Sequence, residues 1–482
     1  MKNRYCCDEY ARSTGLSRRV FVRTGGLAMV SFGFAPRFVG RVLGATAPSS
    51  GSRKVLVCVF QRGAVDGLSM IVPHGEKEYY KVRDGIAIER PGRGNDANRA
   101  IDLDGFFGLH PALAPLQPWY RDGHLAIVHA VGSPDATRSH FDAQDYMETG
   151  APGVKSTTDG WLNRLLAETA EAELAGPQAL MRGMAMTQQD PRALSGGQVS
   201  LTVGDLQQFL GGQGAPARRD QVSDQQMDEA NMAGTDMSNR RAQAEAERRQ
   251  AQSARDRRTQ RQRESLLSGF EALYGKNEDD LVLAAGSDAL DAVSFLKTAD
   301  PLRYQPANRA RYPGGLGRQL QQVAQLIKAD VGLEIAFADI GGWDTHRQQG
   351  AAQGQLANRL REFGQALAAF AQDLGDRMED VVVLTMSEFG RTVEQNGSQG
   401  TDHGHANACL VLGGAVNGGK VYGEWPGLKR EQRYEGRDLA ITTDFRDVFG
   451  EVADTHLQPR NPDALFPGHP LDRRIYKGLI KA

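Results

Sequence analysis

The chain contains little cysteine, with four such residues in 482. Cys6 and Cys7 lie in a basic N-terminal segment, whereas Cys58 and Cys409 lie within apolar, strand-like runs. We expect the latter two to be buried small hydrophobic side chains rather than a disulfide pair. The C-x-x-C-H haem motif and a dinucleotide-binding glycine fingerprint are also missing, so no motif supports a haem or nicotinamide protein.

The sequence has no apolar run of the ~20 residues that a membrane span needs. The N-terminal run from Thr24 to Phe34 is too short, and it follows the segment SRRVFVR (17–23), which resembles a twin-arginine export signal. Ala45-Thr46-Ala47 fits an A-x-A cleavage site. Residues 1–47 are therefore predicted to be a twin-arginine signal peptide. The export machinery would be a partner, and the mature protein would be periplasmic or secreted without a stable membrane span.

The chain also lacks an excess of positive charge. Removing residues 1–47 takes away eight Lys or Arg and two Asp or Glu, which leaves 49 basic and 57 acidic residues and a net charge of −8. A nucleic-acid partner is not expected for such a surface, because binding to phosphates needs basic side chains. With 40% hydrophobic and 24% charged residues, the composition is that of a globular protein.

What the chain does contain is a series of apolar, β-branched runs, each typical of a strand buried on both faces. These runs are Lys54–Phe60, Leu125–Val131, Leu333–Asp339, Asp380–Met386 and the segment that ends in LVLGG at 410–414. Amphipathic helices are predicted between them, most clearly over 356–374, where apolar residues recur at spacings of three and four. The alternation predicts an α/β fold with a doubly wound, mainly parallel sheet and helices on both faces.

One region departs from this pattern. Residues 191–301 form a candidate insertion or cap, and within it lies a polar arm at 221–265. The stretch Arg240–Glu264 contains no large apolar residue and is rich in helix-forming residues, so we expect a long solvated helix or a partly disordered arm. The remainder of 48–482 is predicted to be one α/β domain.

Acidic and imidazole side chains gather at the ends of the predicted strands. Because parallel strands end at one edge of a sheet, groups that are far apart in sequence can meet there. A mixture of carboxylates and imidazoles suits a divalent metal, with zinc expected first and manganese or iron as alternatives. The candidate ligands are Asp66, His140, Asp344, His346, Glu388, Asp402, His403 and His405.

The segment before one predicted helix carries a second kind of chemistry. Ser139 stands near the start of a helix that ends at Gly150, where backbone N–H groups and the helix dipole favour an anion. Its hydroxyl could be an activated nucleophile or only a helix cap, and both interpretations stay open. Arg391 or Arg138 could bind the oxyanion.

Several motifs together resemble the DUF1501 family, whose members are often exported by the twin-arginine route. They span nearly all of the mature chain and read QRGAVDGLS, LHPAL, RSHF, GGWDTH, SEFGRT and TDHGHA. The resemblance implies membership of the alkaline phosphatase/sulfatase superfamily, with a one- or two-metal site and a nucleophile at a helix N-terminus. It further implies that Asp66 is the metal-binding aspartate of the first strand, that Ser139 is the nucleophile, and that Asp344 and His346 are an Asp/His pair.

The resemblance leaves one assignment open. The superfamily's Asp-His-Gly follows a strand like Asp380–Met386, but Glu388 and Phe389 stand there, and a literal Asp-His-Gly comes at 402–404. Either Glu388 is a ligand with His403 or His405 as the later histidine, which topology favours, or Asp402 and His403 are the pair. Phe389 then occupies the place of an expected histidine.

The sequence leaves three hypotheses for the function. The first is a metal-dependent hydrolase of phosphate or sulfate esters, acting on a small molecule or a polysaccharide. The second is a non-catalytic exported binding or assembly protein with a degenerate metal site. The third is a redox accessory protein, for which the export route is the only support.

Overall fold

The computed structural model describes residues 20–21, 28–31, 53–92, 97–170, 177–210 and 291–481. The chain divides into two compact units, one made of Met1–Gly211 with Ala292–Ala482 and the other of Gly212–Asp291. The polar arm predicted at 221–265 lies outside the described residues, as does most of the predicted signal peptide. The insertion predicted at 191–301 stays a prediction. On its N-terminal side, a short strand at 200–203 belongs to the main sheet.

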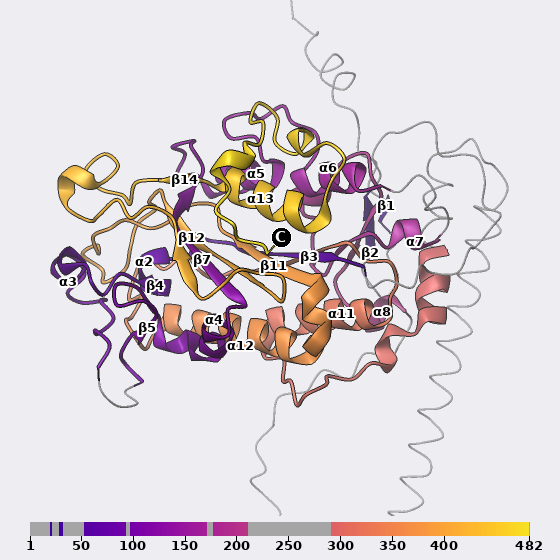
Figure 1. The fold of residues 1–482 in the computed structure, drawn as a ribbon, viewed down its shortest axis with the longest axis horizontal. Helices are drawn as coiled ribbons and strands as arrows, with labels where there is room; N and C mark the ends of the chain where they lie inside the picture. The colour runs from indigo at the N-terminus through magenta and orange to yellow at the C-terminus, as the bar shows by residue number, and fades with distance from the viewer. Residues whose placement is uncertain are drawn as a thin grey trace, which may run out of the picture. The chain divides into compact units, whose positions relative to one another are not determined.

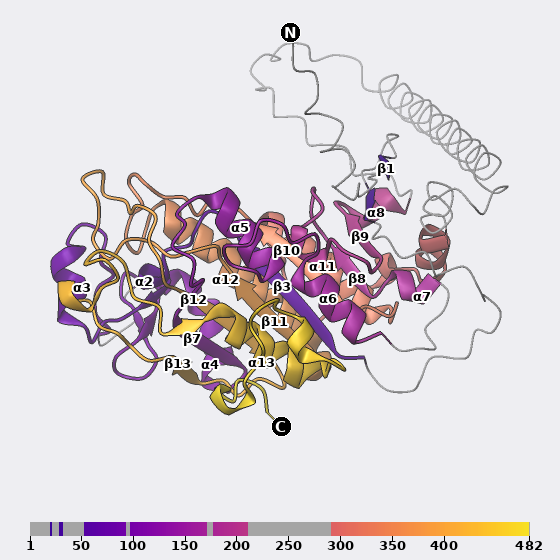
Figure 2. The same cartoon turned by 90° about the horizontal axis from the view of Figure 1, so that it is seen from above.

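A large mixed sheet forms the centre of the first unit. Its order is β9-β8-β10-β3-β11-β12-β7-β13, and β14 also pairs with β7. The strands are β3 (Val55–Gln61), β7 (Leu125–Gly132), β8 (Gly183–Ala185), β9 (Ser200–Val203), β10 (Ile335–Ile340), β11 (Val381–Met386), β12 (Asn407–Gly413), β13 (Lys420–Tyr422) and β14 (Thr443–Asp444). The five predicted strands therefore lie within it, and β8, β10, β3 and β11 run side by side (Figure 2).

Helices cover both faces of this sheet, as predicted (Figure 1). On one face lie α11 (Gly314–Lys328), α12 (Gln355–Leu374), the 3-10 helix η1 (Pro111–Leu116) and α4 (Gln117–Arg121); on the other lie α5 (His140–Thr149), α6 (Trp161–Glu168) and α13 (Phe445–Leu457). Alternate side chains of β3, such as Leu56 and Phe60, pack in one core cluster with Trp161 of α6 and Phe449 of α13. Strands buried on both faces explain the continuous apolar runs, and the α/β fold is confirmed.

The remaining elements are short. They are β1 (Val20–Phe21) and β2 (Ala28–Ser31), which pairs with β9; the three-stranded sheet of β4 (Ile71–Val72), β6 (Gly108–Leu109) and β5 (Ile101–Asp102); the helices α2 (Gly67–Met70), α3 (Lys77–Val82), α7 (Pro177–Leu180) and α8 (Leu206–Phe209); and single 3-10 turns. None of the helices in the described ranges combines the length and apolar character of a membrane span.

The direction of β12 determines where the loop before it lies. This strand runs antiparallel to both of its neighbours, β11 and β7, while β8, β10, β3 and β11 are parallel. No helix separates β11 from β12. A reversed strand begins where its neighbours end, so the loop that leads into β12 lies at the same edge as the loops that leave β10 and β11.

The two cysteines of the sheet behave as predicted. Cys58 on β3 and Cys409 on β12 are both free and buried. Burial raises the pKa of both thiols, that of Cys409 to about 12. They are therefore small apolar core residues and not reactive groups.

Three buried histidines predict a loss of stability in acid. Burial lowers the pKa of His110, His129 and His456 to about 4, whereas an unfolded histidine titrates near 6.5. Below pH 6.5 the unfolded chain binds protons that the folded chain does not, so stability falls as the pH falls towards 4. The full loss is about 3 kcal/mol per histidine. Urea unfolding between pH 7.5 and pH 4.5 measures most of this loss, and the rest falls below that range.

His110 offers a matched control for this prediction. Its Nδ1 accepts a hydrogen bond from the Ala112 amide at the start of η1, a role that the carbonyl of Asn can take over. His110→Asn is expected to show a smaller stability loss between pH 7.5 and pH 4.5 than the parent protein. An equal loss in both proteins would contradict the assignment.

Candidate metal centre

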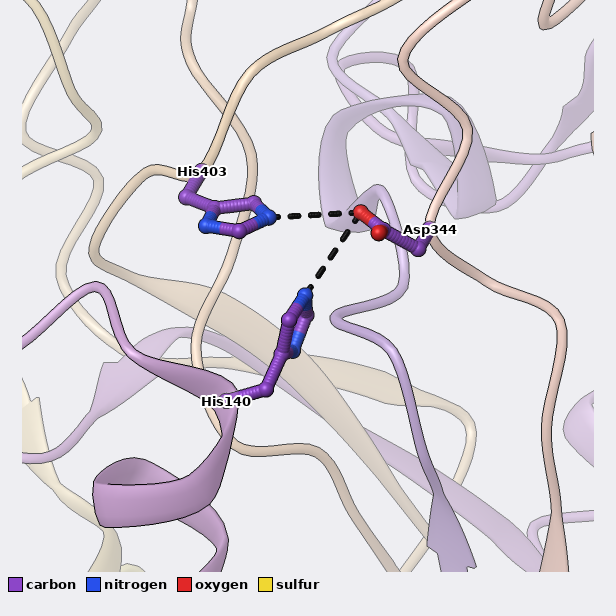
Figure 3. Close-up of side chains that lie close together, drawn as sticks. All are labelled: His140, Asp344 and His403. Atoms are coloured by element: carbon purple, nitrogen blue, oxygen red, sulfur yellow. Dashed lines mark hydrogen bonds and ion pairs between the residues drawn. The ribbon is translucent and has the colours of Figure 1, made fainter.

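Loops from three parts of the sheet meet at its carboxyl edge. His140 is the first residue of α5 and follows β7, Asp344 follows β10, and His403 lies in the loop that leads into β12. Their ligand atoms all lie within 4.8 Å of one another, and Figure 3 shows the three side chains pointing towards a common centre. The Oδ1 atom of Asp344 lies 3.5 Å from Nε2 of His140 and 3.3 Å from Nε2 of His403. This His/Asp/His group has the donors and spacing of a metal-binding triad.

A third imidazole adjoins this group. Nε2 of His346 lies 3.0 Å from Oδ1 of Asp344 and 3.0 Å from Nε2 of His403. Three imidazoles therefore turn the same ring nitrogen towards one carboxylate oxygen. We call His140, Asp344, His346 and His403 the inner cluster.

The orientation of His140 is set by a buried carboxylate. Oε1 of Glu388 lies 2.8 Å from Nδ1 of His140 and also accepts from the side chain of Gln144 and the amide of Gly63. Desolvation alone would raise the pKa of Glu388, but the hydrogen bonds from His140 and its other donors bring it below its usual value. An ionised carboxylate only accepts, so Nδ1 of His140 carries the proton and Nε2 faces the cluster. That Nε2 atom is buried without a hydrogen-bond partner among the described residues.

The other two imidazoles are fixed in the same way. Nδ1 of His346 lies 3.1 Å from Oδ1 of Asp402, and Nδ1 of His403 lies 2.8 Å from the backbone oxygen of Arg138. Both partners only accept, so both Nδ1 atoms carry protons. Two Nε2 lone pairs then face each other at 3.0 Å, which is repulsive unless a proton or a cation lies between them. Burial lowers the pKa of His403, which disfavours the proton.

Asp344 is held ionised beside these rings. Burial alone would raise its pKa, but the hydrogen bond and charge of Arg391 bring it below the usual value. Nη2 of Arg391 lies 2.6 Å from Oδ1 of Asp344 and also donates to the backbone oxygens of Gly63 and Trp343. The Arg391 side chain is fully buried. Its N–H donors therefore hold neighbouring loops together and are not accessible to a ligand. Binding of an oxyanion by Arg391 stays a prediction, and the buried side chain presents no accessible donor for it.

The inner cluster lies within a region that matches a known protein family. The model of the family described as "Protein of unknown function (DUF1501)" matches residues 53–447. The chain belongs to the DUF1501 family. The match includes every residue of the inner cluster. The search of curated proteins finds no match to the chain.

Asp66 lies apart from the inner cluster of the DUF1501 domain. Its Oδ2 atom accepts from Arg83 at 2.6 Å and from Ser69 and Gln349 at 2.7 Å each, and the side chains of Asp66 and Arg83 are buried. The exit of β3 does reach the cluster, but there it presents Gly63, whose backbone packs against Asp344. The first strand thus brings backbone, not a carboxylate, to this point.

Ser139 and Arg138 flank the cluster on the helix side. Ser139 is the N-cap of α5, its Oγ accepts weakly from the Asp142 amide at 3.5 Å, and it is exposed. Capping is thus observed, and the nucleophile role stays a prediction. Arg138 pairs at 2.8 Å with both Glu435 and Asp438, so its charge is already matched.

The two other candidates near 403 differ in position. His405 is buried and stacks on Tyr434 with ring centroids 4.3 Å apart, so it faces away from the inner cluster. Burial lowers its pKa. Asp402 is exposed and accepts from His346 and from the Asn396 side chain, which makes it an orienting partner of His346. The structure therefore places His403 in the inner cluster. Glu388 and Asp402 lie outside it and accept hydrogen bonds from its imidazoles.

The structure also identifies residues that carry no signal in the sequence. Gln144 and Asn396 donate to the carboxylates of Glu388 and Asp402, and so support the imidazoles from behind. Phe389, which the sequence already marks as standing in the place of an expected histidine, lies with its ring centroid 5.0 Å from those of His140 and His403. An amide has no distinctive spacing along the chain, so only the fold reveals such partners.

Proposed function

We propose that this protein binds one divalent metal ion through the inner cluster and uses it to hydrolyse phosphate or sulfate esters. The observation that carries the proposal is the pair of facing Nε2 atoms of His346 and His403, 3.0 Å apart, beside the ionised carboxylate of Asp344. Three imidazole nitrogens and one carboxylate oxygen form a four-ligand set that zinc favours, and manganese or iron accept the same donors. A bound ion of this kind would polarise an ester oxygen by accepting it as a fifth ligand, which zinc can do.

The residues around the cluster support the hydrolytic part. Ser139 is exposed next to His140 and at the N-terminus of a ten-residue helix, where N–H groups stabilise an anionic ester. Its hydroxyl is the proposed nucleophile. The motifs that resemble the alkaline phosphatase/sulfatase superfamily support the same chemistry. The segment at 17–23 supports twin-arginine export, which would bring the protein to esters of small molecules or polysaccharides outside the cytoplasm.

Metal content and ester hydrolysis test this function together. Purified protein, reconstituted with zinc, is expected to contain about one ion per chain and to hydrolyse p-nitrophenyl phosphate or p-nitrophenyl sulfate. Asp344→Ala is expected to lose the ion and the activity, and Ser139→Ala to lose activity while the ion is retained. A metal content far below one ion per chain after reconstitution would exclude the proposal.

A second candidate is a non-catalytic metal-binding or assembly protein. Phe389 stands where the superfamily resemblance places a histidine, the exit of β3 brings the backbone of Gly63 rather than the Asp66 carboxylate to the cluster, and Arg391 already donates to Asp344. With these features, the side chains of the inner cluster provide ligands for one metal ion rather than two. Zinc bound at one ion per chain, with neither ester hydrolysed by the parent protein, would favour this candidate.

Asp402 gives a prediction specific to the orienting contacts. Asp402→Ala removes the acceptor that holds Nδ1 of His346, so zinc affinity is expected to fall by roughly 10–100-fold while folding is unchanged. Competition with a chromophoric chelator measures the affinity. Asp122→Ala, at an exposed aspartate after α4, is the matched control and should bind zinc as the parent does. Equal affinity in both variants would exclude the orienting role.

A further inference from the structure

A polar cavity lies at the same edge of the sheet as the inner cluster. Its volume is about 900 Å³, at the upper end of the roughly 300–1,000 Å³ typical of small-molecule pockets. It is formed where β3, β8, β9 and β10 end and where α5 and α11 pass, and none of the inner-cluster residues lines it. A separate set of side chains therefore determines what it can hold.

One wall of the cavity is a rigid cation. The guanidinium of Arg62 donates from Nε to Asp339 at 2.7 Å and from Nη1 to Glu148 at 2.8 Å and Gln144 at 3.0 Å. It also lies over the ring of Phe60, with its carbon 4.4 Å from the ring centre. Its remaining nitrogen, Nη2, has no partner in the described part of the chain, so a fixed donor is left for a ligand.

Another part of the lining is rich in carboxamides. The side chains of Gln188, Gln189 and Gln208 line the cavity and are exposed to solvent, and none makes a hydrogen bond to another described residue, so all three are open to a ligand. The same holds for the guanidinium of Arg318 on α11. A carboxamide both donates and accepts, which matches hydroxyl groups that do the same. This wall therefore suits a ligand with many hydroxyls.

The lining also excludes other ligand classes. Met186 and Pro191 are the only apolar side chains among the described residues that line the cavity. A lipid or an aromatic ligand would leave the surrounding polar groups unpaired, which is costly. A carbohydrate of a few sugar units satisfies these groups and fits the volume.

Helix α5 connects this cavity to the inner cluster. Gln144 lines the cavity, accepts from Arg62 with Oε1 and donates with Nε2 to Glu388, which in turn orients His140. We propose that the cavity binds the sugar units of a sulfated or phosphorylated carbohydrate, whose ester group lies at the inner cluster. The ester part rests on the proposed function, whereas sugar binding by the cavity does not.

Direct binding measurements test the cavity without turnover. The probes are tetrasaccharides of κ-carrageenan and chondroitin 4-sulfate, their desulfated counterparts and maltotetraose, titrated calorimetrically into the full chain. We expect at least one to bind, and the double variant Gln189→Leu, Gln208→Leu to weaken it at least tenfold with zinc content unchanged. Gln305→Leu, at an exposed glutamine outside the lining, is the control and should bind as the parent does.

The outcomes separate this inference from the proposed function. The zinc-free variant Asp344→Ala is expected to bind the same tetrasaccharide although it hydrolyses no ester. No binding of any probe to the parent protein at millimolar concentration would overturn the inference, even with active ester hydrolysis. Equal affinity in the parent and in the Gln189→Leu, Gln208→Leu variant would overturn it too, because the sugar would then bind elsewhere.

Discussion

Replacement of His403 by alanine is expected to abolish stoichiometric zinc binding. His403 supplies one of the two Nε2 atoms that face each other at 3.0 Å, and its ring also lies 3.3 Å from Oδ1 of Asp344. Its Nδ1 proton is already directed to the backbone oxygen of Arg138, so the ring is pre-oriented to ligate through Nε2. Loss of a ligand exceeds the effect of losing an orienting partner, so affinity should fall by more than about 100-fold.

The same motif contains the control. His405 stands two residues further on, yet it stacks on Tyr434 and takes no part in the inner cluster. His405→Phe keeps an aromatic ring in that stack and is expected to bind zinc with the affinity of the parent. Metal content after dialysis and competition with a chromophoric chelator measure both variants. Loss of zinc in His405→Phe, or its retention in His403→Ala, would contradict the arrangement of the inner cluster.

Much of the fold could be predicted from the sequence because its strands are buried on both faces. A run such as Val55–Gln61 has no polar alternation, which already indicates a sheet covered by helices on both sides. The period of α12 likewise indicates its buried face from the sequence alone. The reversal of β12 could not be predicted, since strand direction depends on the path of the long loop before it and leaves no periodic signal.

The site could be predicted as a list of side chains but not as an arrangement. Asp344, His140 and His403 are all among the predicted ligands, and the fold brings them together. Glu388 and Asp402 are candidates of the same chemical type, yet each accepts a hydrogen bond from an imidazole instead of facing the centre. A ligand and the partner that orients it can both be carboxylates, and only distances distinguish them.

The buried partner of Asp66 could not be predicted from the sequence either. Its partner Arg83 lies at the end of α3, seventeen residues on, in a polar segment without any motif. Removing the carboxylate by Asp66→Ala would leave the Arg83 charge fully buried without a counter-charge. Breaking a buried pair in this way costs about 3–5 kcal/mol. Arg83 also donates to the backbone oxygens of Thr392 and Val393, so the loop after β11 should loosen as well.

The expected result is a large fall in the urea midpoint of Asp66→Ala, with zinc still bound by the chains that remain folded. Asp472→Ala breaks the exposed pair with Arg474 and should leave the urea midpoint nearly unchanged, because solvent screens that pair. The double variant Asp66→Leu, Arg83→Met removes both charges and should be less unstable than Asp66→Ala, because no unpaired charge stays buried. If folded Asp66→Ala instead lost its zinc, Asp66 would act on the metal and the separation between this ion pair and the inner cluster would be wrong.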